Sequence, residues 1–553
     1  MTRTTRLGAL ACGVLAIGCS SLDVGNSNAP DRERAISRGT DLVSLLGGAM
    51  QNWVLAQQGE TPAIATSTMA LQFSMSWGNF GSRVYSSVPR VQFNNAATDP
   101  NIGIVNTPWY NNYGTIASSN IALAQIRAGV VPVVDGQDQT VLARSVARFL
   151  QGASMANIAL FFNQGLYADE NTPQDSAQFI SRQAMRDSAL AKLDSAIALA
   201  GTGSFTLPET FLLTTGWTST QLRQVANTEA ARLLAYFPRS AAENAQVPWA
   251  RVAQYASRGL SAGTAFSPTI RGDQNVFYDG WKAYVGMWDN WMRVNQRVVR
   301  LLDPSQPTPY PTTGRPPAPV SPDARFDPTP RTAAAIGSET ADFIYVPFDF
   351  FNPARGRYHF SDVGYNRYGC HGFSAPDGGG LCEVPIRIAA ENDLLWAEAL
   401  VRSGGSRSQA AQLINNSRVT RGRLPALTGA EAGAGNIPGL APLAGADNND
   451  VLLRAIFFAS PPSRWWRRTT WRARRASSRC RRASWRRCAG RSTRSAVPTA
   501  SPGASRARRT SRRSSSRCRA TIGGQPVSGP GAVLDDARAA NAAARRQRWL
   551  PRN

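Results

Sequence analysis

Apolar residues recur at three- and four-residue steps along most of the chain, which is the period of an amphipathic helix. The clearest case runs from Val141 to Gln164, where Arg144 and Arg148 fall on the face opposite the apolar stripe. The same period predicts further helices at Leu42–Gln58, Thr66–Trp77, Trp109–Ile126, Met185–Ala200, Leu222–Leu234, from Trp249 onward, Ile388–Arg402 and Gln409–Ser417. We find no convincing strand pattern between these stretches. The sequence therefore predicts an all-α fold in which helical hairpins follow one another.

Two segments break the helical period and concentrate aromatic residues. The first lies between Trp77 and Pro108 and is rich in Gly, Asn, Ser and Pro. A long irregular segment with this many aromatic rings is more often functional than idle. The second spans 271–302, where several aromatics after Trp281 again step by three and four. That spacing also fits one buried helical face, so a core role for these rings stays open.

The later part of the body is less regular. Residues 303–331 hold ten prolines, which predicts a loop or an extended excursion. Residues 340–387 are irregular, aromatic and Gly-rich. Within them Cys370 and Cys382 flank a Gly-rich stretch, and in an exported protein this pair is expected to close it as a disulfide. The alternative is a metal site with His359 and His371, but the gap between the two cysteines lacks the usual CxxC spacing.

The N-terminus has the pattern of an export signal. Arg3 and Arg6 precede a short apolar run, which at about eleven residues is too short for the roughly 20 needed to span a bilayer. The run ends in Ala-Ile-Gly-Cys at 16–19, which is similar to the lipobox of bacterial lipoproteins. That resemblance predicts a signal peptide at 1–18 and lipidation of Cys19, with a stable anchor if several acyl chains are attached. Ser20, by the same resemblance, favours the outer membrane. The alternative is an ordinary signal peptide in which Cys19 is incidental.

The charge is concentrated in the last hundred residues. Residues 1–450 carry 35 basic and 34 acidic side chains, whereas 451–553 carry 26 basic and 2 acidic. From Arg454 to Arg519 there are 21 Arg, no Lys and no acid, and mutual repulsion predicts an open or disordered tail at 454–553. One interpretation is an arm for nucleic acid or anionic lipid. The favoured one is a shifted reading frame in GC-rich DNA, because exported lipoproteins rarely meet nucleic acid. No nucleic-acid partner is expected.

The common catalytic and cofactor motifs are missing from the sequence. We find no GxSxG elbow, HExxH motif, Walker loop or dinucleotide fingerprint, and there are only two His. We therefore expect no enzymatic activity, no cofactor and no metal. Carboxylates without an evident partner in the sequence, such as Asp273, Asp279 or Asp289, leave open an all-α polysaccharide-processing enzyme.

Several stretches together resemble the RagB/SusD family of outer-membrane nutrient-uptake lipoproteins. They are the lipobox with LDVGNSNAP, then WYNNYGTIASSNIALAQI, ARSVARFLQGASMANIALFFNQG, LDSAIALA, VANTEAARLLAYFPRSAAENAQVPWARVAQYASRGL, RVVRLLDPSQP and ENDLLWAEALVRSGG with AAQLINNSR. The resemblance covers roughly 19–430 and implies tetratricopeptide-like hairpins with a loop-rich, ligand-facing half, here bounded at 19–453. It also implies capture of an oligosaccharide or similar nutrient at the cell surface and its transfer to a SusC-like TonB-dependent transporter. The Arg-rich tail departs from the family pattern.

Sugar binding needs aromatic rings for the C–H faces of a pyranose and polar side chains for its hydroxyls. By region, the family presents such rings from loops between early helices and from the later irregular half. The residues expected to bind ligand here are Trp77, Asn79, Phe80, Tyr85, Tyr278 and Trp281. A core role for each ring is the alternative. A third possible function is a helical scaffold that holds protein partners during membrane protein assembly.

Overall fold

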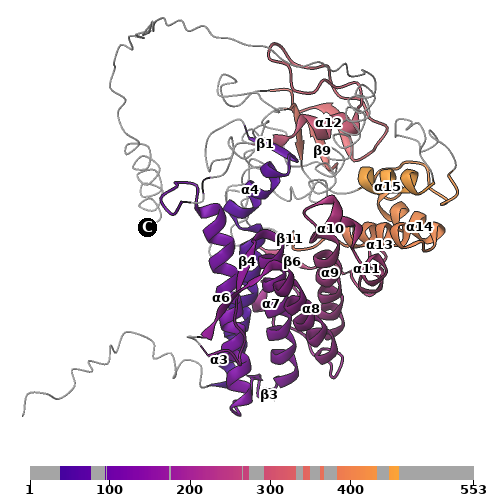
Figure 1. Ribbon diagram of the computed structural model, residues 1–553. Coiled ribbons are helices and arrows are strands. Elements are labelled where there is room, and N and C mark those ends of the chain that lie inside the picture. The colour runs from indigo at the N-terminus through magenta and orange to yellow at the C-terminus, as the bar shows by residue number, and fades with distance from the viewer. Residues whose placement is uncertain are drawn as a thin grey trace, which may run out of the picture. The chain divides into compact units, whose positions relative to one another are not determined.

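The computed structural model describes residues 38–75, 94, 96–173, 176–264, 266–272, 292–331, 341–348, 361–365, 383–431 and 448–459. The chain divides into two units, 1–483 and 484–553, and every described residue belongs to the first. The described chain is mainly helical, which confirms the predicted all-α class. Its helices are α3 (Gly39–Gln58), α4 (Glu60–Met69), α6 (Gly103–Arg127), α7 (Thr140–Phe161), α8 (Arg182–Leu199), α9 (Ser219–Tyr236), α10 (Ala241–Ala245), α11 (Trp249–Ala256), α12 (Gln296–Leu302), α13 (Ala389–Ser403), α14 (Arg407–Arg418) and α15 (Asn448–Ala459) (Figure 1).

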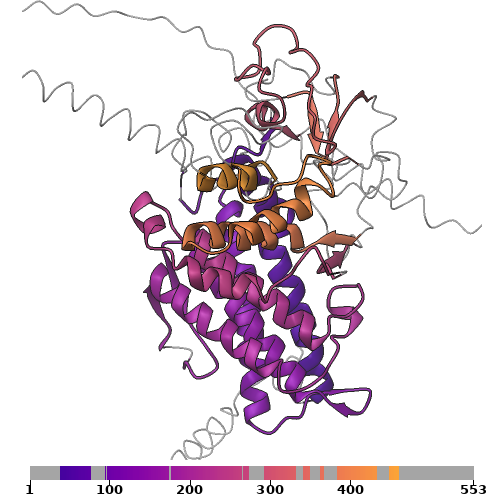
Figure 2. The ribbon, with the colours of Figure 1, turned by 90° about the vertical axis from the view of Figure 1, so that its right-hand side faces the viewer.

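Neighbours in sequence are mostly neighbours in space, as the hairpin prediction requires. Helix α3 packs on α6, α6 on α7, α7 on α8 and α8 on α9 (Figure 1). Helix α9 packs on α11, α11 on α13 and α13 on α14, and these later helices face the viewer in Figure 2. Helix α15 then packs against both α13 and α14. The predicted helical-hairpin array is therefore confirmed.

Helix α7 is the centre of the array, since it contacts α3, α6, α8 and α9 and is buried from Leu142 to Ala159, apart from the exposed Arg144 and the partly buried Arg148. Small residues allow this density of packing. A Cβ on Gly152 would lie 2.8 Å from the backbone nitrogen of Leu193, so α7 and α8 approach as closely as they do only because Gly stands there. One turn earlier in α7, Phe149 meets Trp53 of α3 edge-to-face, with ring centroids 5.1 Å apart.

Local sequence signals fix several helix ends. Thr218 and Gln221 form a reciprocal capping box at the start of α9. Helix α13 ends at Gly404, whose φ of +75° places it in the left-handed region that favours glycine. These signals explain why the predicted boundaries of the main helices lie close to the observed ones.

Short strands join the irregular segments and were not predicted. The pairs are β1 (Phe73–Met75) with β7 (Met292–Val294), β6 (Thr269–Arg271) with β11 (Glu383–Pro385), β2 (Val133–Val134) with β3 (Gln137–Asp138), and β4 (Gln164–Tyr167) with β5 (Gln178–Ser181), all antiparallel. A three-stranded sheet has the order β10 (Val363–Tyr365), β9 (Phe343–Tyr345), β8 (Phe326–Pro330). Residues from β1, β7, α12 and this sheet form a second apolar core.

The helix predicted at Thr66–Trp77 is wrong in its second half. Helix α4 ends at Met69, Leu71 has a φ of +54°, and the chain then enters β1. The reason is non-local: residues 73–75 pair with Met292–Val294, more than two hundred positions away. A periodicity argument cannot detect such a partner.

The Pro-rich segment 303–331 is irregular up to β8, the strand with which it joins the small sheet, and it also contacts residues beside that sheet. Its Tyr310 hydroxyl donates to Asp362 at 3.1 Å, and Arg315 forms an ion pair with the same carboxylate. Farther on, buried Arg325 pairs with Asp323. The two Nη groups of Arg325 also donate to the last two carbonyls of α15, at 3.0 and 3.1 Å. Helix α15 thus continues past residue 453, where the folded body was expected to end.

Candidate functional site

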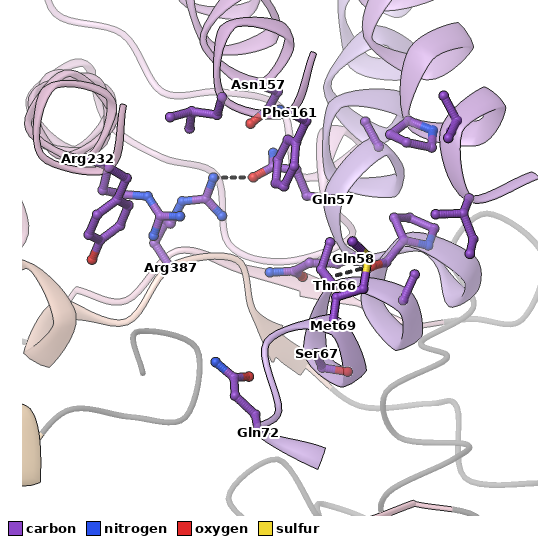
Figure 3. A pocket seen from close by; sticks show the side chains of 18 of the residues that line it. Gln57, Gln58, Thr66, Ser67, Met69, Gln72, Asn157, Phe161, Arg232 and Arg387 are labelled. Carbon is purple, nitrogen blue, oxygen red and sulfur yellow. Dashed lines mark hydrogen bonds between the residues drawn. The ribbon is translucent and has the colours of Figure 1, made fainter. Parts of the chain in front are cut away.

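A cavity of about 350 Å³ lies where α3, α4, α6, α7 and α9 meet the segment of β11 and the residues after it (Figure 3). These elements are far apart in sequence. Helix α3 contributes its last turn, α7 its last two turns, and α9 the face that carries Glu229, Arg232 and Tyr236. The cavity is therefore a product of how the hairpins stack.

One wall of the cavity is apolar. It includes Met69 from α4, Pro108 from α6, and Phe161 and Phe162 at the end of α7. Met69 and Phe161 are 48% and 46% exposed, which is unusual for side chains of this size and type. An exposed apolar wall inside a concave surface is a common feature of small-ligand sites.

The other end of the cavity is charged and tightly paired. The guanidinium group of Arg387 binds the Glu229 carboxylate and the Gln57 side chain. Arg232 donates from Nη1 to Glu391 Oε1 at 2.7 Å. Figure 3 shows the guanidinium groups of Arg232 and Arg387 close together at this end of the cavity. The two positive charges of Arg232 and Arg387 balance the two negative charges of Glu229 and Glu391. This end of the cavity therefore carries polar groups without net charge.

The pKa shifts of the two arginines agree with this pairing. Burial disfavours the charged form of Arg232, but Glu391 and Glu229 outweigh it and raise the pKa of Arg232 above its usual range. For Arg387, burial and the neighbouring Arg232 lower the pKa despite Glu229. Arginine has so high a pKa that both side chains stay charged at neutral pH. The pairs therefore act as fixed hydrogen-bonding groups.

Two polar atoms at the cavity are buried without a hydrogen-bond partner among the described residues: Gln58 Oε1 and Arg232 Nε. The Gln58 amide donates to the carbonyls of Pro385 and Ile386, at 3.1 and 3.0 Å, so its oxygen is left over. Arg232 Nε lies 3.9 Å from Glu229, beyond hydrogen-bond distance. Each such atom costs about 1–3 kcal/mol of stability.

The residues that the sequence singled out lie outside the described residues. These are the ligand-binding candidates Trp77, Asn79, Phe80, Tyr85, Tyr278 and Trp281, the lipidation site Cys19, the pair Cys370 and Cys382, the alternative ligands His359 and His371, and the carboxylates Asp273, Asp279 and Asp289. Each of these assignments stays a prediction.

The described strands nevertheless connect the two predicted aromatic segments to one place. Strand β1 ends at Met75, just before the first segment, and β7 begins at Met292, just after the aromatic part of the second. Met75 and Met292 are directly paired across the two strands. Gln72, next to β1, lines the cavity. The described residues that flank these segments, Met75 and Met292, therefore lie side by side, three residues or more from the cavity-lining Gln72.

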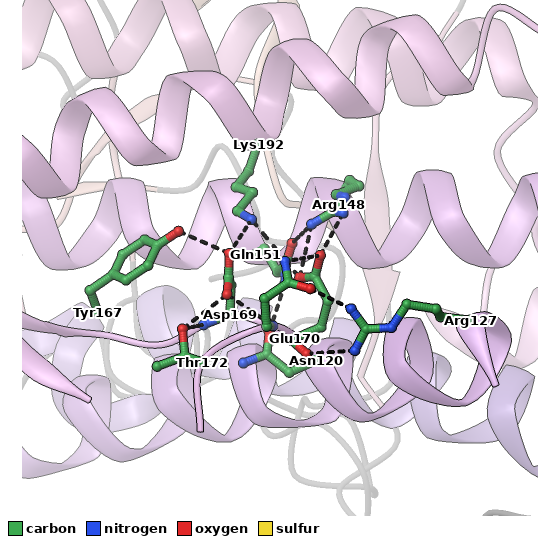
Figure 4. A network of polar contacts seen from close by, with 10 residues as sticks. Asn120, Arg127, Arg148, Gln151, Tyr167, Asp169, Glu170, Thr172 and Lys192 are labelled. Carbon is green, nitrogen blue, oxygen red and sulfur yellow. Dashed lines mark hydrogen bonds and ion pairs between the residues drawn. The ribbon is translucent and has the colours of Figure 1, made fainter. Parts of the chain in front are cut away.

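A second polar cluster lies on the helical body, where the loop between β4 and β5 crosses α6, α7 and α8 (Figure 4). Arg148 of α7 donates two hydrogen bonds to the Glu170 carboxylate, of 3.0 and 2.7 Å, and the Gln151 amide donates a third of 3.0 Å. Lys192 of α8 lies 2.9 Å from Asp169. The two carboxylates are thus surrounded by donors from two helices.

The charges of this cluster fit a structural role, in which it holds the β4–β5 loop against the helices. Burial would raise the pKa of Asp169, but hydrogen bonds from Lys192, the Asn171 amide and Thr172 lower it well below the usual range. Burial is likewise outweighed at Glu170, whose pKa is lowered by Arg148 and Gln151. Acid catalysis needs a carboxyl group that keeps its proton near neutral pH. Since both groups are held ionised, the arrangement fastens the loop to the helices.

Two features are absent from the described part of the chain. No cluster of three or more His, Cys, Asp or Glu side chains there is arranged to hold a metal ion. None of its helices combines the length and the apolar character needed to cross a membrane.

Sequence reasoning missed the cavity residues Gln58, Met69, Phe161, Arg232 and Arg387. The spacing of Glu229 and Arg232 on one helix gave a weak local signal, an i,i+3 ion pair. Nothing in the sequence links either residue to Arg387, which is more than 150 positions away. Because Arg supplies nearly all the basic residues of this chain, individual arginines carried little information.

Fold and cavity define a class: a helical-hairpin protein with a cavity that has one apolar wall and one hydrogen-bonding end. A scan with protein-family models gives no match, and a search of curated proteins gives none either.

The chain is similar to several solved structures. A SusD homologue from Parabacteroides distasonis is 14% identical with a TM-score of 0.48, over 77% of this chain and 82% of that one. A putative sugar-binding protein from Bacteroides vulgatus is 11% identical with a TM-score of 0.49, over 78% and 85%. Surface glycan-binding protein A from Bacteroides fluxus is 15% identical with a TM-score of 0.47, over 78% and 88%.

Proposed function

We propose that this chain is a cell-surface lipoprotein of the RagB/SusD type, which binds an oligosaccharide or a similar nutrient and delivers it to a TonB-dependent outer-membrane transporter. The observation that carries the proposal is the cavity of about 350 Å³ with an apolar wall and a neutral, hydrogen-bonding end. The sequence stretches that resemble the family, described above, supply the transport role.

The chemistry of the cavity suits a sugar. Pockets for small ligands have volumes of about 300–1,000 Å³ and combine apolar walls with a few polar groups. The C–H face of a pyranose would pack on Met69 and Phe161, and its hydroxyls would meet the polar side chains that line the hydrogen-bonding end of the cavity. Since the charges at this end balance, it favours a neutral polyhydroxyl ligand over a strongly charged one.

The aromatic segments are proposed to complete this site. Trp77, Asn79, Phe80 and Tyr85 follow β1, and Tyr278 and Trp281 precede β7. In this proposal their rings supply further stacking surfaces for the sugar. Trp77→Ala is expected to weaken binding while the melting temperature stays unchanged. If binding falls only together with the melting temperature, Trp77 is a core residue.

The binding test uses the full-length protein, extracted in mild detergent, with isothermal titration calorimetry. The probes are disaccharides and hexasaccharides of the maltose, cellobiose and xylobiose series. Binding to at least one series, weakened by Met69→Ala, is expected. Release of shorter products during incubation would instead indicate an enzyme. A well-folded protein that binds none of these probes and releases no product contradicts sugar capture.

The anchor and the transporter are tested separately. The protein is expressed in its native host with an internal tag, and the co-purifying proteins are identified by mass spectrometry. We expect a large β-barrel transporter in stoichiometric amount, and we expect Cys19→Ser to move the protein out of the membrane fraction. An acylated, folded protein that purifies alone would contradict the delivery role, and capture of other partners would indicate a scaffold.

A further inference from the structure

Exposed aromatic side chains gather next to the cavity. The exposed large hydrophobic residues of the described chain include three aromatics, Tyr110, Phe161 and Phe179. Phe161 lines the cavity, and Phe179, on β5, is 63% exposed. The other exposed hydrophobics besides Met69 are valines at scattered positions in the sequence. An exposed aromatic surface is costly in water and commonly marks a binding surface.

A continuous run of rings links the cavity wall to Phe179. Phe162 lines the cavity and meets Trp109 of α6 edge-to-face, with centroids 4.8 Å apart. Trp109 in turn lies 6.3 Å from Phe179, with the two ring planes only 21° apart. We call Phe162, Trp109 and Phe179 the aromatic ridge. Its inner end belongs to the cavity and its outer end is open to solvent.

Strand register shows what accompanies Phe179. In the β4–β5 ribbon Phe179 is opposite Leu166, and Ser181 is opposite Gln164. Side chains two positions apart share a face, so the exposed Gln164 lies diagonally beside Phe179. The opposite face is packed, because a Cβ on Gly165 would lie 2.6 Å from both Ile158 and Met185. Phe179 and Gln164 are therefore on the solvent-facing side.

The chemistry of this face is that of a sugar platform. Neither β4 nor β5 contains a charged residue, and the polar side chains are amides and hydroxyls. A charged partner would find no complementary charge on these two strands, whereas a neutral polyhydroxyl chain finds a ring and an amide side by side. Packing alone does not account for Phe179, since most of its surface stays exposed.

We propose that the aromatic ridge is a second contact surface for the ligand chain, so that a glycan held at one end in the cavity continues over Trp109 and Phe179 with Gln164 as a hydrogen-bonding partner. This inference rests on the proposed function and sharpens it: the ligand class is an oligosaccharide longer than the cavity itself. Short fragments occupy the cavity alone, and only longer ones reach the ridge.

The test compares chain lengths on the same variants. Titrations with the disaccharide and hexasaccharide of a bound series are run on the wild type, Phe179→Ala, Gln164→Ala and the control Val320→Ala, which removes a 75%-exposed side chain from the Pro-rich segment. Phe179→Ala is expected to weaken hexasaccharide binding by about three- to tenfold, which is the typical contribution of one aromatic contact. Disaccharide binding is expected to stay within about twofold of the wild type. Gln164→Ala is expected to act in the same direction, and Val320→Ala to change neither.

The outcomes separate the two proposals. If the wild type binds none of the probes, the proposed function fails and this inference falls with it. If the wild type binds sugar but Phe179→Ala leaves hexasaccharide affinity unchanged, or weakens both lengths equally, the ridge is refuted as an extension while sugar capture stands. If Phe179→Ala instead removes a co-purifying protein with sugar affinity intact, the surface is a protein contact.

Discussion

Glu229→Gln tests how far the buried charges at the cavity depend on one another. The substitution keeps the size of the side chain and removes one negative charge from a balanced group of four. Arg387, only 6% exposed, then loses its charged partner, and Arg232 loses a carboxylate 3.9 Å away. Removing one partner of a buried ion pair costs about 3–5 kcal/mol, because the other charge stays buried without compensation. We expect the free energy of unfolding to fall by that amount.

Urea unfolding followed by circular dichroism measures the loss. Glu209→Gln is the matched control, since it makes the same chemical change at an exposed position and should stay within about 0.5 kcal/mol of the wild type. The double variant Glu229→Gln with Arg387→Met removes the unpaired cation as well. It is expected to be more stable than Glu229→Gln alone, as buried pairs replaced by apolar groups often are.

Either of two results would refute this reasoning. A loss below about 1 kcal/mol for Glu229→Gln would mean that water or another group compensates Arg387. A double variant no better than the single one would mean that the loss comes from altered packing, with the unpaired charge contributing little. The cycle of single and double variants distinguishes these causes.

Three further substitutions test other parts of the fold. Burial raises the pKa of Asp393, so the folded state holds this proton more strongly than the unfolded state. Stability should therefore fall as the pH rises above 3.8, the usual pKa of an aspartate. Asp393→Asn should flatten the plot of urea midpoint against pH in that range. Arg325 binds the last two carbonyls of α15 and the buried Asp323 carboxylate. Arg325→Met should therefore lower the free energy of unfolding by about 3–5 kcal/mol and speed amide hydrogen exchange in α15. Unchanged exchange in α15 would contradict the anchoring role. Gly404→Ala should cost about 1 kcal/mol, seen as a lower melting temperature, because a Cβ is strained at a φ of +75°.

The sequence determined the helical part of this protein. Apolar residues at steps of three and four, with small residues between them, suffice to place α7, α8, α9 and α13 within a few residues of their observed ends. Capping signals such as Thr218 and Gly404 act over one helical turn, so they too can be recognised from the sequence alone. Helices are local structures, and a local pattern carries the information that specifies them.

Only the tertiary structure decided the strands and the cavity. Residues 73–75 read as the end of a helix until their pairing with residues 292–294 is known. Arg387 and Glu229 are 158 positions apart, and their contact depends on how the hairpins stack. A sequence records which side chains are available, whereas non-local pairing depends on packing that the whole chain determines together. The cavity, built from five helices and residues of the strands β10 and β11, is therefore visible only once the chain is folded.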